Sequence, residues 1–103
     1  MNIPNAILEE IRCYAKKFPN EESCGVIIKD RVLKFLPCEN LSKNKLYHFV
    51  MDPFILIENN VVVLFHSHVN SSSSPSCLDK KIMYELGLPF LIYSLRDDNF
   101  DLH

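Results

Sequence analysis

Two histidines, a serine and an aspartate follow the most apolar run of the chain. The run 61–65 leads directly into His66-Ser67-His68, and Ser76 and Asp79 follow after a serine-rich stretch. Side chains of a strand alternate between its faces, so His66 and His68 share one face, about 7 Å apart along the backbone. Asp79 can add an oxygen from a second element. Two nitrogens and one oxygen, with a fourth position for water, are the ligand set of a catalytic zinc site.

Each of these residues also has an ordinary structural explanation. Two histidines can simply end a strand, and Ser-x-x-Asp at a helix start is a capping box, in which Ser76 caps and Asp79 favours the positive helix end. If Pro75 is the first helical residue, Ser74 is the cap, and Ser76 and Asp79 share one helix face. Taken with the two histidines, the spacing favours metal binding. Both histidines must be neutral to bind, so metal affinity should fall as pH drops.

The same residues resemble the signature H-x-H-x7-S-x-x-D of the JAMM (MPN+) metallopeptidase family. A second hallmark of that family, E-x-x-G near the N-terminus, matches Glu22 to Gly25. Residues 19–25, 49–53 and 87–90 are most similar to the JAMM domains of phage tail-assembly proteins. One position departs from the pattern, because Val69 stands where the family usually has a proline. Proline would stiffen the exit from the strand, so we expect a less rigid loop here.

The resemblance implies an α/β fold, with one domain over residues 1–103 and a mixed, twisted sheet flanked by helices. It implies zinc as the metal, with His66, His68 and Asp79 as ligands. Ser76 is expected to hydrogen-bond the substrate carbonyl oxygen as it becomes an oxyanion, which can contribute ~3 kcal/mol. The alternative for Ser76 is helix capping alone.

Glu22 is the expected general acid/base, which takes a proton from the activated water and passes it to the leaving amine. The alternative is a solvated turn glutamate. Strand alternation puts Glu21 and Glu22 on opposite faces, so only one of them can serve. The E-x-x-G spacing selects Glu22.

The expected function is zinc-dependent hydrolysis of a peptide or isopeptide bond in phage tail assembly. A second reading is removal of a ubiquitin-like or sulfur-carrier protein from its conjugate. A third is a non-catalytic MPN scaffold, against which the retained ligands argue. The expected partner is therefore a protein or peptide substrate, either a phage tail protein or a ubiquitin-like protein.

Composition limits the other function classes. The chain has 103 residues and a net charge of −2, and about half of its residues are apolar, which is typical of one globular domain. It has no basic patch, which argues against a nucleic-acid partner. Its apolar runs are too short to span a membrane and no signal peptide is evident, so we expect a cytoplasmic protein, in the host cytoplasm if phage-encoded.

Hydrophobic periodicity and turn residues predict three helices and six strands. The helices cover residues 3–17, 52–58 and 75–86. The strands cover residues 23–29, 32–36, 46–50, 61–66, 88–95 and 100–102, and the first two form a hairpin. The loop 70–74 has no apolar anchor and is expected to be mobile. The four cysteines form no C-x-x-C pair and are expected to be free, mostly buried thiols. His48 and His103 are expected to be structural or exposed, with His48 as an alternative lining residue of the substrate cleft.

Overall fold

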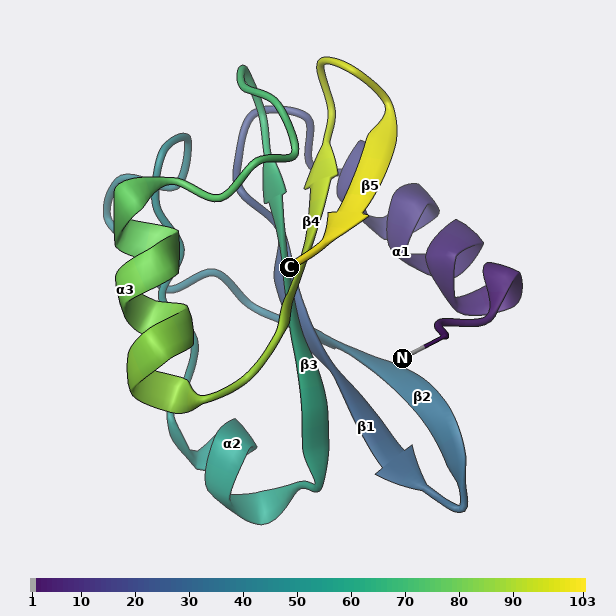
Figure 1. Cartoon of the computed structure of the whole chain (residues 1–103). Coiled ribbons are helices and arrows are strands. Elements are labelled where there is room, and N and C mark those ends of the chain that lie inside the picture. The colour runs from purple at the N-terminus through teal and green to yellow at the C-terminus, as the bar shows by residue number, and fades with distance from the viewer. Residues whose placement is uncertain (1) are drawn as a thin grey trace.

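A five-stranded mixed sheet forms the centre of the fold in the computed structural model, which describes residues 2–103 (Figure 1). The strand order is β2-β1-β3-β4-β5. The strands are β1 (Cys24–Asp30), β2 (Val32–Cys38), β3 (Val61–His68), β4 (Phe90–Ser94) and β5 (Asn99–Leu102). Only β3 and β4 are parallel, and the other neighbours are antiparallel. The central position of β3 explains its continuous apolar run, because both of its faces are covered.

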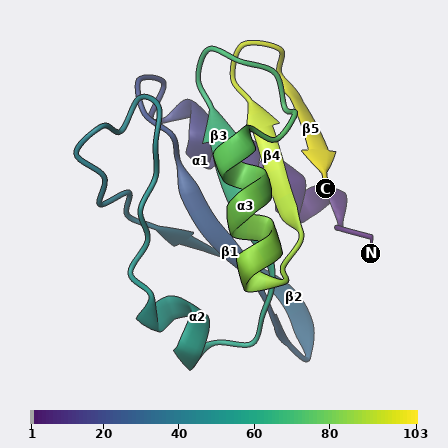
Figure 2. The ribbon, with the colours of Figure 1, turned by 60° about the vertical axis from the view of Figure 1, so that its left-hand side comes forward.

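Helices cover both faces of the sheet. The helix α1 (Asn5–Lys16) buries Ile7, Ile11 and Ala15 against one face, at the helical spacing seen in the sequence. The helix α3 (Cys77–Leu86) lies on the opposite face, and the short α2 (Phe54–Glu58) precedes β3. Figures 1 and 2 together show α1 and α3 on opposite sides of the sheet. Within residues 2–103, no helix is both long and apolar enough to cross a membrane.

Most predicted elements form close to their predicted bounds. The hairpin of β1 and β2 is confirmed, and Arg31 turns it with a positive φ of 63°. Gly87 ends α3 in the left-handed conformation, as its position after a helical pattern predicts. The strand β3 extends to His68, two residues beyond its predicted end at His66, so both histidines lie inside it.

The predicted strand at residues 46–50 is wrong, because this segment forms a turn and an irregular chain. The side chain of Asn40 accounts for the difference. Its amide nitrogen donates to the carbonyl of His48 at 2.9 Å, and its amide oxygen accepts from the backbone N–H of Val50 at 3.1 Å. These bonds tie the segment to a loop instead of to the sheet, so its β-propensity is overridden.

The loop after β3 has no apolar anchor, as predicted, but it has polar anchors that the prediction did not include. Ser73 is almost completely buried, and four successive carbonyls of the loop accept hydrogen bonds. Sequence hydropathy cannot show such anchors, because the loop carbonyls and the Ser73 hydroxyl form hydrogen bonds mainly with residues far along the chain.

Candidate metal centre

The two histidines of β3 reach the site because they share the face of the sheet that α3 covers. Ser67 lies between them and points the other way, as strand alternation requires. The Ser67 hydroxyl accepts from the backbone N–H of Ser23 at 2.8 Å, and the Ser67 N–H donates to the Ser23 carbonyl at 2.9 Å. These two bonds hold the residue next to Glu22 against the His-Ser-His segment. Ser67 is therefore a positioning residue that the sequence reading missed.

Asp79 reaches the same place from the first turn of α3. Ser76 is the N-cap, its hydroxyl accepts from the Asp79 N–H at 3.0 Å, and its own N–H donates to Asp79 Oδ2 at 2.9 Å. The alternative with Pro75 as the first helical residue is wrong, because the helix begins at Cys77. The capping box and the proposed ligand are thus the same carboxylate. Capping fixes its orientation, and both of its oxygens face histidines.

The possible ligand atoms of His66, His68 and Asp79 converge and are all buried. The two Nε2 atoms lie 3.2 Å apart, and each lies 3.1 Å from one Asp79 oxygen. A tetrahedral ion with ligand bonds of about 2.0 Å holds its ligand atoms roughly 3.3 Å apart. The separation of the two Nε2 atoms therefore fits a small tetrahedral cation such as zinc, and one oxygen of Asp79 lies close to each of them.

The hydrogen bonds of His68 add a chemical reason for a cation. Its Nδ1 lies 2.7 Å from the Ser72 carbonyl, which can only accept, so Nδ1 carries a proton and donates. In the neutral ring Nε2 then carries a lone pair and no proton, and it faces Asp79 Oδ2, which is also an acceptor. Either a second ring proton or a metal ion must lie between them. Burial alone would lower the pKa of His68, but its hydrogen bonds to Asp79 and Ser72 raise it. Without a metal ion, a second ring proton can therefore separate Nε2 from the Asp79 oxygen.

The surroundings of His66 differ from those of His68. The ring of His66 is fully buried, stacks on Phe49 with centroids 4.6 Å apart, and meets the edge of Phe90 at 5.3 Å. Burial in this apolar setting lowers the pKa of His66, so the ring is neutral and can serve as a ligand. Burial would raise the pKa of Asp79, but hydrogen bonds from both rings and from the Ser76 N–H hold it far below its usual range.

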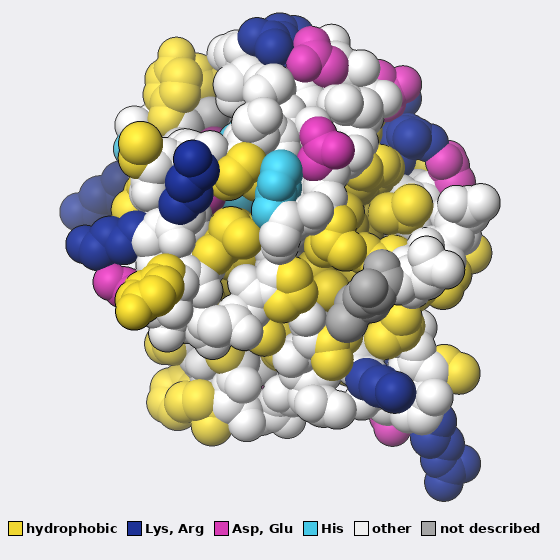
Figure 3. Space-filling view, in the orientation of Figure 1, with side chains coloured by type: hydrophobic (Ala, Val, Ile, Leu, Met, Phe, Trp, Pro, Cys, Tyr) yellow, Lys and Arg dark blue, Asp and Glu magenta, His cyan; other side chains and the backbone are white. Residues whose placement is uncertain are grey.

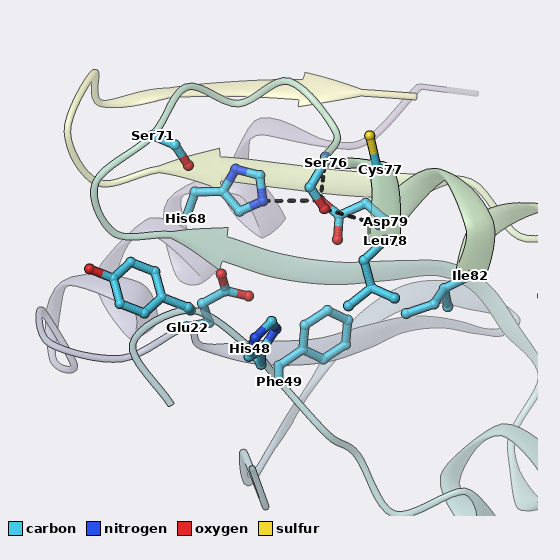
Figure 4. Close-up of a pocket in the computed structure, with 11 residues that line it drawn as sticks. Glu22, His48, Phe49, His68, Ser71, Ser76, Cys77, Leu78, Asp79 and Ile82 are labelled. Carbon is cyan, nitrogen blue, oxygen red and sulfur yellow. Dashed lines mark hydrogen bonds and ion pairs between the residues drawn. The ribbon is translucent and has the colours of Figure 1, made fainter. Parts of the chain in front are cut away.

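Glu22 lies beside this group, and its carboxylate points toward His68 (Figure 4). It sits just before β1, with its backbone held by a bond from its N–H to the Lys45 carbonyl at 2.6 Å and by a bond from Asn40 to its own carbonyl at 2.8 Å. Burial raises the pKa of Glu22 from 4.5 to about 8, while His68 opposes and Asp79 adds to the rise. Glu21 is only half-buried and does not line this space.

Gly25 explains why a glycine follows Glu22 at this spacing. A Cβ at this position would lie 2.7 Å from the Leu36 carbonyl oxygen and 2.7 Å from the Phe35 ring. Phe35 packs edge-on against Tyr14 and Phe65 in the core under α1. Both contacts are with β2, so glycine lets the Phe35 ring lie directly over β1, close to the segment that carries Glu22.

An open pocket of about 350 Å³ connects the group to the surface. Its walls include Glu22, His68, Ser76 and Asp79 together with residues of the 47–49 segment and of α3. His48 is exposed at this wall, as its alternative reading predicted, while His103 binds the loop after β3. Beyond the pocket, large apolar side chains are exposed over α2 and α3 (Figure 3), among them Phe54, Ile57 and Tyr84.

All four cysteines are free thiols, but only Cys24 and Cys38 are buried. Cys13 and Cys77 are exposed, so the expectation of mostly buried thiols is half right. The sulfur of Cys77 points away from the proposed ligands in Figure 4, and Cys77 is not one of the three converging residues.

Comparisons with known proteins agree with this geometry. The family model of prokaryotic homologues of the JAB domain matches residues 4–102. Tail tip assembly protein K of Escherichia phage N15 is 38% identical over 85 residues, which cover 78% of this chain and 35% of that protein. The chain thus spans about a third of the length of this relative.

Two solution structures resemble the fold. A protein from Desulfitobacterium hafniense gives a TM-score of 0.68 at 25% identity, over 95% of this chain and 86% of that one. A protein from Salinibacter ruber gives a TM-score of 0.63 at 22% identity, over 99% and 78%. With a family match over almost its whole length, the chain belongs to the prokaryotic homologues of the JAB domain and is similar to a phage tail-assembly member of that group.

Proposed function

We propose that this chain is a zinc-dependent hydrolase that cleaves a peptide or isopeptide bond. One observation carries the proposal: the ligand atoms of His66, His68 and Asp79 lie at the spacing of a tetrahedral metal site, beside a buried carboxylate in an open pocket. The similarity to a tail tip assembly protein supports a tail protein as the substrate and the host cytoplasm as the place of action. Exposed apolar side chains at the pocket wall, Tyr47 and Leu78, also favour a protein substrate, because such surfaces are typical of protein contacts.

The three ligands would hold zinc, which when bound supplies Lewis-acid chemistry and makes water nucleophilic at neutral pH. Glu22 is placed to accept a proton from the attacking water and to return it to the leaving amine. In the metal-free protein, burial raises the pKa of Glu22, and a bound cation would lower it again toward the range of a group that must both take and give a proton.

Ser76 is the polar side chain of the pocket wall that is bonded directly to Asp79. Its hydroxyl oxygen accepts from the Asp79 N–H, which leaves the hydroxyl hydrogen free to donate. That hydrogen can bind the substrate carbonyl oxygen as negative charge develops on it. The hydrogen bond from the Asp79 N–H orients the Ser76 hydroxyl, so a donor in a fixed position faces the charge that develops on the substrate oxygen.

The test combines metal analysis with cleavage of a peptide library that includes isopeptide-linked peptides. The wild-type protein should hold about one zinc per chain and cleave a subset of the library. The Glu22→Gln variant should keep zinc and cleave ~10²–10⁴-fold more slowly, as expected for loss of a general acid/base. Glu21→Gln is the matched control and should behave as the wild type.

Two results would contradict the proposal. One is undiminished zinc in a His66→Ala/His68→Ala double variant, which would place the metal elsewhere. The other is a zinc-loaded wild type whose cleavage products also arise, at the same rate, with Glu22→Gln. A zinc-loaded chain that cleaves nothing would instead support the scaffold reading.

A further inference from the structure

The serine-rich loop after β3 is the motif that the proposed chemistry does not yet use. Four of its successive carbonyls accept hydrogen bonds, and three of the donors lie in or next to β4 and β5. The pairs are Arg96 Nη1 to Asn70 at 3.2 Å, Ser94 Oγ to Ser71 at 2.7 Å, His68 Nδ1 to Ser72 at 2.7 Å and His103 Nε2 to Ser73 at 2.9 Å. The loop is therefore built into the sheet edge.

Ser73 is the only serine of the run whose exposed fraction is as low as 2%. Its hydroxyl donates to Asp101 Oδ2 of β5 at 2.6 Å, a short bond to an ionisable acceptor. Ser74, the next residue, is exposed and takes no part through its hydroxyl in this contact. Ser71 and Ser74 are exposed and Ser72 is half-buried, so the burial of Ser73 on Asp101 sets it apart from the rest of the run.

The peptide group between Ser72 and Ser73 lies between two held points. On one side Ser94 binds the Ser71 carbonyl, and on the other Asp101 binds the Ser73 hydroxyl. The Ser72 carbonyl consequently has little freedom to rotate away from His68. A histidine coordinates through Nε2 only when that atom has lost its proton, and an acceptor at Nδ1 enforces this tautomer.

We propose that Ser73 and Asp101 are positioning residues for the metal centre, which act through the Ser72 carbonyl to fix the tautomer and ring orientation of His68. The positioning role rests on the proposed function, because it serves the proposed metal site. The hydrogen-bond chain itself is independent of any metal. It assigns a role to the C-terminal strand, which contributes no ligand.

The tautomer can be measured directly in metal-free protein that carries Asp79→Ala, because Asp79 Oδ2 otherwise competes with the Ser72 carbonyl for the single proton of the neutral ring. Long-range 15N–1H correlation spectra at alkaline pH, where the rings are neutral, distinguish Nδ1–H from Nε2–H. In this background, with Ser73 and Asp101 unchanged, His68 should be in the Nδ1–H form. Ser73→Ala should give a mixture of both forms, Ser73→Thr should restore the Nδ1–H form, and Ser74→Ala is the matched control.

Zinc affinity, measured by competition with a chromophoric chelator, is the second readout. Loss of a partner that orients a ligand typically weakens metal binding about 10–100-fold, and we expect Ser73→Ala and Asp101→Ala to fall in this range. Asp101 is exposed on an edge strand, so its variant keeps the test open should Ser73→Ala unfold.

The outcomes separate this inference from the proposed function. A single Nδ1–H tautomer and wild-type zinc affinity in both Ser73→Ala and Asp101→Ala overturn the positioning role, while the metal site stands. A wild type that binds no zinc, but whose His68 tautomer changes in both variants, supports the positioning chain and removes the proposed function.

Discussion

Glu22 should make the metal-free protein less stable as the pH rises, and Glu22→Gln should remove that loss. Burial raises its pKa from 4.5 to about 8, so over this range the folded state keeps a proton that the unfolded chain has released. The stabilising contribution of the protonated carboxyl is fully present below pH 4.5 and is lost as the pH rises through about 8. Glutamine has nearly the same shape and does not titrate.

The size of the effect follows from the same pKa. A rise from 4.5 to about 8 corresponds to about 5 kcal/mol above pH 8, because each tenfold change in proton affinity is worth about 1.4 kcal/mol. Glu22 lines an open pocket, and water reaching it screens the charge. We therefore expect Glu22→Gln to stabilise the metal-free protein by roughly 1–3 kcal/mol at pH 8, and by much less at pH 5.

Urea unfolding in the presence of a chelator at pH 5 and pH 8 measures this difference. Comparing each variant with the wild type at the same pH cancels contributions from groups far from Glu22, while His68 and Asp79, which interact with Glu22, remain part of the measured difference. Glu21→Gln, at a residue that does not line the pocket, is the matched control. If the stability gain of Glu22→Gln is the same at both pH values, ionisation of the buried Glu22 carboxyl does not destabilise the fold, and the reasoning is wrong.

Two further variants test the packing and the cap. Gly25→Ala should lower the free energy of unfolding by about 1–3 kcal/mol, because its Cβ would overlap the Leu36 carbonyl and the Phe35 ring. The control Gly87→Ala meets nothing within 4 Å and should show only the backbone strain of its positive φ. Equal melting temperatures for Gly25→Ala and the wild type would contradict this prediction. Ser76→Gly should lower the stability by only a few tenths of a kcal/mol, since glycine is an acceptable N-cap. The same variant should slow peptide cleavage by ~10²-fold, because the proposed donor to the substrate carbonyl oxygen is lost. Full activity would show that Ser76 acts only as a helix cap.

The parts of the site that could be predicted from sequence are those set by local spacing. Strand alternation places His66 and His68 on one face, and the Ser76-x-x-Asp79 pattern begins a helix, so both facts are readable over a few residues. The sequence presented capping and metal binding by Asp79 as alternatives. The structure makes the two compatible, because the carboxylate that caps the helix also has an oxygen facing His66.

The parts that could not be predicted depend on partners far along the chain. The segment 46–50 has strand-forming residues, yet the amide of Asn40 binds it elsewhere. The loop 70–74 looks unanchored because its anchors, Ser94 and Asp101 among them, follow it by many residues. A buried asparagine or serine is recognised only once its neighbours are known.

The order of the site residues along the chain has a consequence for how the protein matures. All three proposed ligands lie within residues 66–79, so a short stretch of chain already holds a complete metal-binding set, and closing so small a loop costs little entropy. Glu22 joins them only when β1 pairs with β3, a contact between distant parts of the sequence. Under the proposed function, a nascent or partly folded chain would bind metal before it could cleave a substrate, because the general acid/base joins the site only in the finished fold.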